Sequence, residues 1–98
     1  MKILVLGDVM GASGRNALNK KLPQLIKNNE IDFVIVNGEN SADDGKGITQ
    51  EIAEEFFKIG VDVITSGNHI WDKQETANYI NKENRLLRPA NLIEGSPG

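Results

Sequence analysis

The sequence contains no cysteine, and His69 is its single histidine. Disulfide bonds, zinc sites built on cysteine thiolates and a cysteine nucleophile are therefore excluded from these 98 residues. The lack of cysteine is compatible with a reducing cytoplasm. Any chemistry in this chain must rely on oxygen-bearing side chains and one imidazole.

Long apolar runs and an excess of one charge are also missing. The opening run ends after six residues at Gly7-Asp8, which is too short for a signal peptide core or a membrane span. The formal charge is −3 with 26% charged residues, and no basic stripe follows one face. We expect no membrane segment and no extended nucleic-acid footprint.

Short runs rich in β-branched residues alternate with segments of helical periodicity. The runs are continuous, which is typical of strands covered on both faces. Thr49 suits the start of the second helical segment and Gly60 suits its end, whereas Pro23 predicts a kink or restart in the first. The predicted strands are Ile3 to Leu6, Phe33 to Val36, Val61 to Thr65 and Leu86 to Arg88, and the predicted helices are Arg15 to about Asn28, Thr49 to Ile59 and Lys73 to Asn81.

This alternation predicts an α/β fold with a parallel sheet, in the order β-α-β-α-β-α-β. The length of 98 residues fits a single domain spanning residues 1–98. Turn-forming residues at the end of the sequence leave no terminal element to close the sheet. We expect that the chain stops partway through its domain and that its open sheet edge could support a homo-oligomer.

Polar side chains follow a glycine at the end of each of the first three predicted strands. The carboxyl ends of parallel strands line one crevice, so these side chains are expected to meet. Glycine at each corner allows a sharp turn and a close approach by a ligand. The residues are Asp8, then Glu39 and Asn40, then Asn68 and His69.

Two carboxylates, two amides and a nearby imidazole suit ions such as Mn, Fe or Zn. Two such ions can clamp a phosphate and activate water, and a neighbouring histidine can protonate a leaving oxygen. Each residue alone has a simpler interpretation, because Asp8 could cap a helix, Glu39 could be surface charge, and Asn is common in turns. The recurrence at three consecutive strand ends favours a metal site.

These motifs resemble the first three motifs of the calcineurin-like metallophosphoesterases. The segments VNGENSA at 36–42, TSGNHIWD at 65–72 and RPAN at 88–91 resemble its YmdB-like branch more narrowly. The resemblance extends along the whole chain, and it implies the first half of a four-layer αββα sandwich. It also implies a cytoplasmic bacterial phosphodiesterase that hydrolyses 2′,3′-cyclic or 3′,5′-cyclic nucleotides with two metal ions, of which iron is expected and Mn or Zn is possible.

The resemblance further implies a role for each of the five residues. Asp8 and Asn40 would bind the first metal, Glu39 would bridge both, Asn68 would bind the second, and His69 would be the proton donor. The family draws three more histidine ligands from its second half, and this sequence has none of them. We therefore expect a C-terminally truncated member that is inactive or nearly so alone.

Two other interpretations stay open at this stage. The same strand ends could form a non-catalytic module that binds a nucleotide or phosphate through backbone amides and the loop from Ser41 to Gly47. The chain could also serve as an assembly piece, because an unfinished sheet exposes an edge that can pair with another strand.

Overall fold

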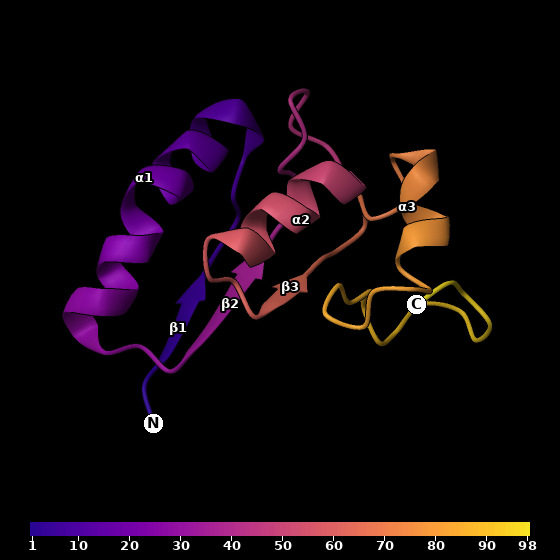
Figure 1. Ribbon diagram of the computed structural model, residues 1–98. Helices are drawn as coiled ribbons and strands as arrows, with labels where there is room; N and C mark the ends of the chain where they lie inside the picture. Colours follow the sequence, from indigo (N-terminus) through magenta and orange to yellow (C-terminus); the bar gives the residue numbers. More distant parts are fainter.

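The computed structural model describes residues 1–98 and consists of three strands that alternate with three helices (Figure 1). The elements are β1 (Ile3–Leu6), α1 (Gly11–Asn29), β2 (Phe33–Asn37), α2 (Gln50–Lys58), β3 (Val63–Thr65) and α3 (Gln74–Tyr79). The strands form one parallel sheet in the order β1-β2-β3, with Ile3 opposite Phe33 and Ile35 opposite Val63. The prediction of an α/β fold with a parallel sheet is confirmed.

The core fills one face of this sheet. Leu22 of α1 and Phe56 of α2 are almost fully buried and share a cluster with Val34, Val36 and Ile64 from the strands. Two successive right-handed crossovers that advance in the same direction bring their helices to the same face of a sheet, and α1 and α2 lie together in Figure 1. Successive strand residues therefore point alternately to the face of the sheet that packs against the helices and to the opposite face, which has no helix against it.

The prediction that both faces are covered is wrong for β1. The side chains of Ile3 and Val5 are 53% and 66% exposed, whereas Leu4 and Leu6 between them pack against the core. Both alternating sets of β1 are apolar, so periodicity alone could not show that only one face has a partner. The open face is an apolar surface that these 98 residues do not cover.

Helix α1 begins earlier than predicted, at Gly11, and continues through Pro23 to Asn29 as one element. Pro23 does not divide it, and the buried Leu18 and Leu22 precede the proline. The helix ends where Glu30 adopts a left-handed conformation with φ of 53°. None of the helices has the combination of length and apolar composition needed to cross a bilayer.

The predicted cap of α2 is confirmed. The Thr49 side chain accepts a hydrogen bond from the Ile52 amide at 3.2 Å, and Gly60 follows the helix with φ of 114°. We expect Thr49→Ala to lower the free energy of unfolding by about 1 kcal/mol, because a helix amide loses its partner. Urea denaturation would measure this loss, and Ser13→Ala, within the exposed part of α1, should change stability by less than about 0.5 kcal/mol.

The predicted fourth strand forms only a single bridge. Leu86 pairs with Ile64 in parallel, through hydrogen bonds from Ile64 N to Arg85 O and from Leu87 N to Ile64 O. Pro89 has no amide hydrogen to extend the ladder. The segment from Leu86 to Arg88 therefore continues the direction of the sheet without becoming a strand. The third helix is also shorter than predicted, at Gln74–Tyr79.

Candidate metal centre

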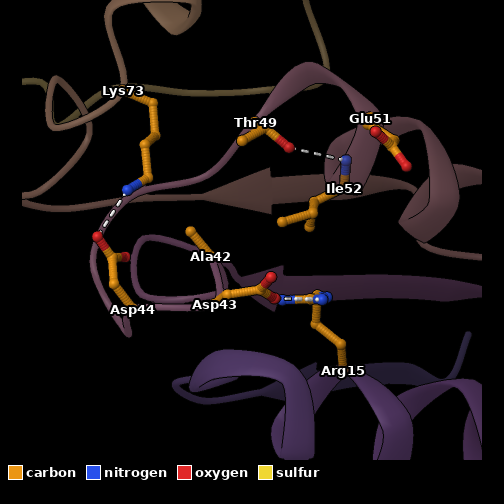
Figure 2. Close-up of a pocket in the computed structure, with 8 residues that line it drawn as sticks. All are labelled: Arg15, Ala42, Asp43, Asp44, Thr49, Glu51, Ile52 and Lys73. Atoms are coloured by element: carbon orange, nitrogen blue, oxygen red, sulfur yellow. Dashed lines mark hydrogen bonds and ion pairs between the residues drawn. The ribbon is translucent and has the colours of Figure 1, made fainter.

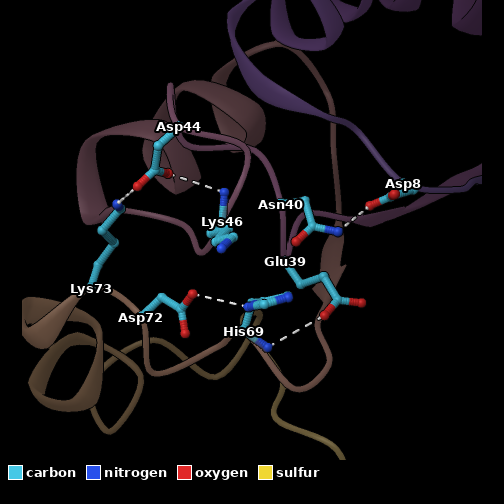
Figure 3. Close-up of polar contacts among 8 residues, drawn as sticks. All are labelled: Asp8, Glu39, Asn40, Asp44, Lys46, His69, Asp72 and Lys73. Atoms are coloured by element: carbon cyan, nitrogen blue, oxygen red, sulfur yellow. Dashed lines mark hydrogen bonds and ion pairs between the residues drawn. The ribbon is translucent and has the colours of Figure 1, made fainter.

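The three polar corners meet at the carboxyl ends of the strands (Figure 3). The Asn40 side-chain amide donates to Asp8 Oδ1 at 3.0 Å, which joins the corners after β2 and β1. The His69 backbone amide donates to Glu39 Oε2 at 3.5 Å, which joins the corners after β3 and β2. The fold thus joins four of the five predicted residues in two pairs, Asn40 with Asp8 and His69 with Glu39.

Asn68 lies in the same corner, but its side chain is exposed. The turn that carries it is closed by a hydrogen bond from Ile70 N to Gly67 O at 3.1 Å. No hydrogen bond links the Asn68 side chain to the other four residues. The structure therefore places Asn68 beside the group, with its amide available to a ligand.

Gly67 is needed because the Glu39 carboxylate lies directly over it. A Cβ atom built at Gly67 would overlap both carboxylate oxygens of Glu39. Gly38, which precedes Glu39, is also confined, since its Cβ would lie 2.9 Å from Ile64 Cγ2 in the core. The position of the Glu39 carboxylate therefore depends on the close approach of the backbone at Gly38 and Gly67.

The loop between β2 and α2 is held beside this group by two ion pairs (Figure 2). Arg15 contacts Asp43 at 2.7 Å and the Ser41 carbonyl at 2.6 Å, and Lys73 contacts Asp44 at 2.7 Å. The hydrogen bond from Lys73 lowers the pKa of Asp44 below its ordinary value. The cleft between them has a volume of about 440 Å³, and both of its basic side chains already have acidic partners.

Part of the backbone of the same loop is occupied by contacts within the loop. The amides of Ser41, Ala42 and Gly45 donate to loop carbonyls, and the Lys46 amide donates to Asp44 Oδ1 at 3.0 Å. Amides that are already bonded cannot also cradle a phosphate. The amides of Asp43, Asp44 and Gly47 form no such bond, so the phosphate-binding module remains an alternative prediction.

The His69 ring has a partner that the sequence interpretation did not include. Its Nδ1 atom lies 2.9 Å from Asp72 Oδ2, and both side chains are about one-third exposed. The available signal was an acidic residue three positions after the histidine, within a turn. Such a spacing is common and does not by itself predict contact, because it depends on the turn that the chain adopts.

The chemistry of the donors fits a hard or borderline metal ion. The carboxylates of Asp8 and Glu39 and the amide of Asn40 supply oxygen, and no thiolate competes. No three His, Cys, Asp or Glu side chains gather closely enough to form a complete ligand set by themselves. The carboxylates of Asp8 and Glu39 and the neighbouring amides therefore fit one part of a metal centre and do not complete it.

A model of the YmdB-like protein family matches residues 4–98. The chain belongs to this family. A 2′,3′-cyclic-nucleotide 2′-phosphodiesterase from Bacillus subtilis is 45% identical over all 98 residues, which correspond to 37% of that protein. This YmdB-like chain therefore spans about a third of the length of the relatives it matches.

Two solved structures resemble the YmdB-like chain closely. A hypothetical protein from Thermus thermophilus superposes with a TM-score of 0.90 at 37% identity, covering the whole chain and 37% of that protein. A phosphatase from Mycoplasma pneumoniae gives a TM-score of 0.87 at 42% identity, covering 95% of the chain and 33% of that protein. The predicted metallophosphoesterase fold and YmdB-like branch are confirmed.

Proposed function

We propose that the full-length protein carrying this sequence is a metal-dependent phosphodiesterase that hydrolyses cyclic nucleotides of the 2′,3′-cyclic or 3′,5′-cyclic kind. The observation that carries the proposal is the pair of contacts that joins the three strand ends, Asn40 with Asp8 and His69 with Glu39. The name of the Bacillus subtilis relative supports the choice of a cyclic nucleotide. The lack of cysteine agrees with a reducing cytoplasm, which is the compartment we propose.

Each residue of the proposed centre has a separate task. Asp8 and Asn40 would hold one ion, Asn68 would hold a second, and Glu39 would bridge the two, with iron favoured and manganese or zinc as substitutes. When bound, such a pair supplies Lewis acidity that lowers the pKa of water and offsets phosphate charge. The contact between Asn40 and Asp8 keeps both side chains aligned, because the amide nitrogen donates and its oxygen stays free.

His69 would supply the proton that the leaving oxygen requires. Its backbone contacts Glu39 and its ring lies beside Asp72, so the imidazole would stand next to the proposed metal ligands as the proposed proton donor. Hydrolysis of a cyclic phosphodiester forms one phosphorus–oxygen bond to the attacking water and breaks one to the leaving oxygen, and the departing alkoxide accepts the proton. Donation by a positioned side chain is worth about 100- to 10,000-fold in rate.

Residues 1–98 alone are expected to lack this activity. Two carboxylates and two amides provide too few strong donors for two ions, and no cluster of acidic or histidine side chains adds to them. The relatives are nearly three times as long, and we propose that the remaining ligands come from the region that this chain does not span. Activity is therefore expected of the longer protein.

We expect Asp8→Asn and Glu39→Gln to reduce bound metal in the full-length protein, because each removes a negative oxygen donor. Elemental analysis after purification would measure the ions, and 2′,3′-cyclic AMP would serve as substrate. Glu51→Gln is the matched control, since Glu51 is an exposed carboxylate at the start of α2. Wild-type protein that carries no transition metal would rule the proposal out.

A further inference from the structure

His69 and Asp72 form a contact that the proposed reaction does not yet use. The His69 Nδ1 atom lies 2.9 Å from Asp72 Oδ2. An ionised carboxylate accepts hydrogen bonds and donates none, so the Nδ1 atom must carry the hydrogen. In the neutral ring this leaves Nε2 as the unprotonated nitrogen, on the side away from Asp72 (Figure 3).

The turn from His69 to Asp72 is held in place by backbone hydrogen bonding and by packing against the loop at Gly47. The Asp72 amide donates to the His69 carbonyl at 3.1 Å, and Ile70 between them is fully buried. Gly47 packs against the same turn, since a Cβ there would lie 3.2 Å from Asp72 Cβ and 3.3 Å from the His69 carbonyl oxygen. Asp72 therefore reaches the ring from a backbone position that the neighbouring loop supports.

Nearby cations are engaged elsewhere. Lys73, the next residue, pairs with Asp44, and Arg15 pairs with Asp43. No lysine or arginine forms an ion pair with Asp72, and the His69 ring is its one charged or ionisable partner. Asp72 therefore has an imidazole as its ionisable partner, whereas Asp43 and Asp44 pair with basic side chains.

We propose that Asp72 is a positioning residue for His69, holding the ring with its hydrogen on Nδ1 and directing Nε2 toward the reacting group. This proposal rests on the proposed function, because it takes His69 as the group that donates a proton to the leaving oxygen. The hydrogen bond to Asp72 keeps the hydrogen on Nδ1 and fixes the direction of the ring.

The ring state can be tested without any activity assay. His69 is the single histidine of the 98 residues, so ¹⁵N NMR of this chain gives one pair of ring nitrogen signals. In mildly alkaline solution, we expect the wild-type signals of a ring with its hydrogen on Nδ1. Asp72→Asn should shift them toward the Nε2-protonated form, and Asp44→Asn, a nearby carboxylate paired with Lys73, should not. Wild-type signals of an Nε2-protonated ring, or signals unchanged in Asp72→Asn, would overturn the proposal.

A kinetic test asks whether Asp72 acts through His69. In the full-length protein, we expect Asp72→Asn to lower kcat by about 10- to 100-fold, less than the whole contribution of a general acid, with KM and metal content within about twofold. Adding Asp72→Asn to His69→Ala should cost nothing further, because interacting residues are non-additive. An equal loss in both backgrounds contradicts the proposal. A wild-type protein with no phosphodiesterase activity would instead contradict the function, and the NMR result would still decide the pairing.

Discussion

Replacing His69 by alanine is expected to lower kcat by about 100- to 10,000-fold in the full-length protein, which is the range for loss of a general acid. The reason is that the departing oxygen must then take its proton from water. The His69 ring contacts Asp72, and its backbone amide contacts Glu39, so removing the ring leaves the proposed metal ligands and their backbone in place. Steady-state kinetics with 2′,3′-cyclic AMP and elemental analysis of the same samples would measure both effects.

The metal content distinguishes the assigned role from its main competitor. Metal retained together with a large loss in kcat agrees with a proton donor, whereas loss of both together would show that His69 is itself a ligand. Asn68→Ala provides the contrast, because the neighbouring side chain is the proposed ligand and its removal should reduce metal. A leaving group that needs no proton should also restore much of the activity of His69→Ala.

Alanine at Gly67 is expected to lower activity by about 100-fold or more, although the residue contributes no functional group. Its Cβ would occupy the space of the Glu39 carboxylate, so that side chain must move away from the centre. A displacement of about 1 Å at a reacting site can cost about 100-fold in rate. The bound metal should fall as well, because Glu39 is the proposed bridge, and elemental analysis would detect this loss.

Gly7→Ala is the matched control for this substitution. Gly7 precedes Asp8 in the first corner as Gly67 precedes Asn68 in the third, but a Cβ at Gly7 would meet no atom within 4 Å. We expect near wild-type metal content and activity for Gly7→Ala, and a thermal melting temperature close to that of the parent. Equal behaviour of the two variants would contradict the placement of Glu39 over Gly67.

Local chemistry was sufficient to predict much of the fold. The β-branched runs located the three strands to within two residues, and Thr49 located the start of α2. These features depend on residues close in sequence. The sequence could not predict which face of β1 is exposed. That depends on the face of the sheet against which both crossover helices pack, and the residues of Ile3–Leu6 are apolar on both faces.

The candidate site likewise has features that the sequence predicted and features that it did not. The order of strands was enough to predict that the corner after β2 would contact both neighbouring corners, through Asn40 with Asp8 and Glu39 with the His69 amide, since parallel strands end at one edge. The overlap between Glu39 and Gly67 and the pairing of His69 with Asp72 depend on side-chain directions in turns. Turn geometry is set by contacts with a separate loop, so the spacing of residues in the sequence does not determine it.

The strand order β1-β2-β3 follows the order of the chain, and this bears on how the protein forms during synthesis. Each strand pairs with the one made just before it, so no strand has to wait for a distant partner. The corners that carry Asp8, Glu39 and His69 can thus form in the order in which their strands are made. In the folded chain Ile3 and Val5 remain exposed, so the sheet still presents an apolar face after its strands have paired.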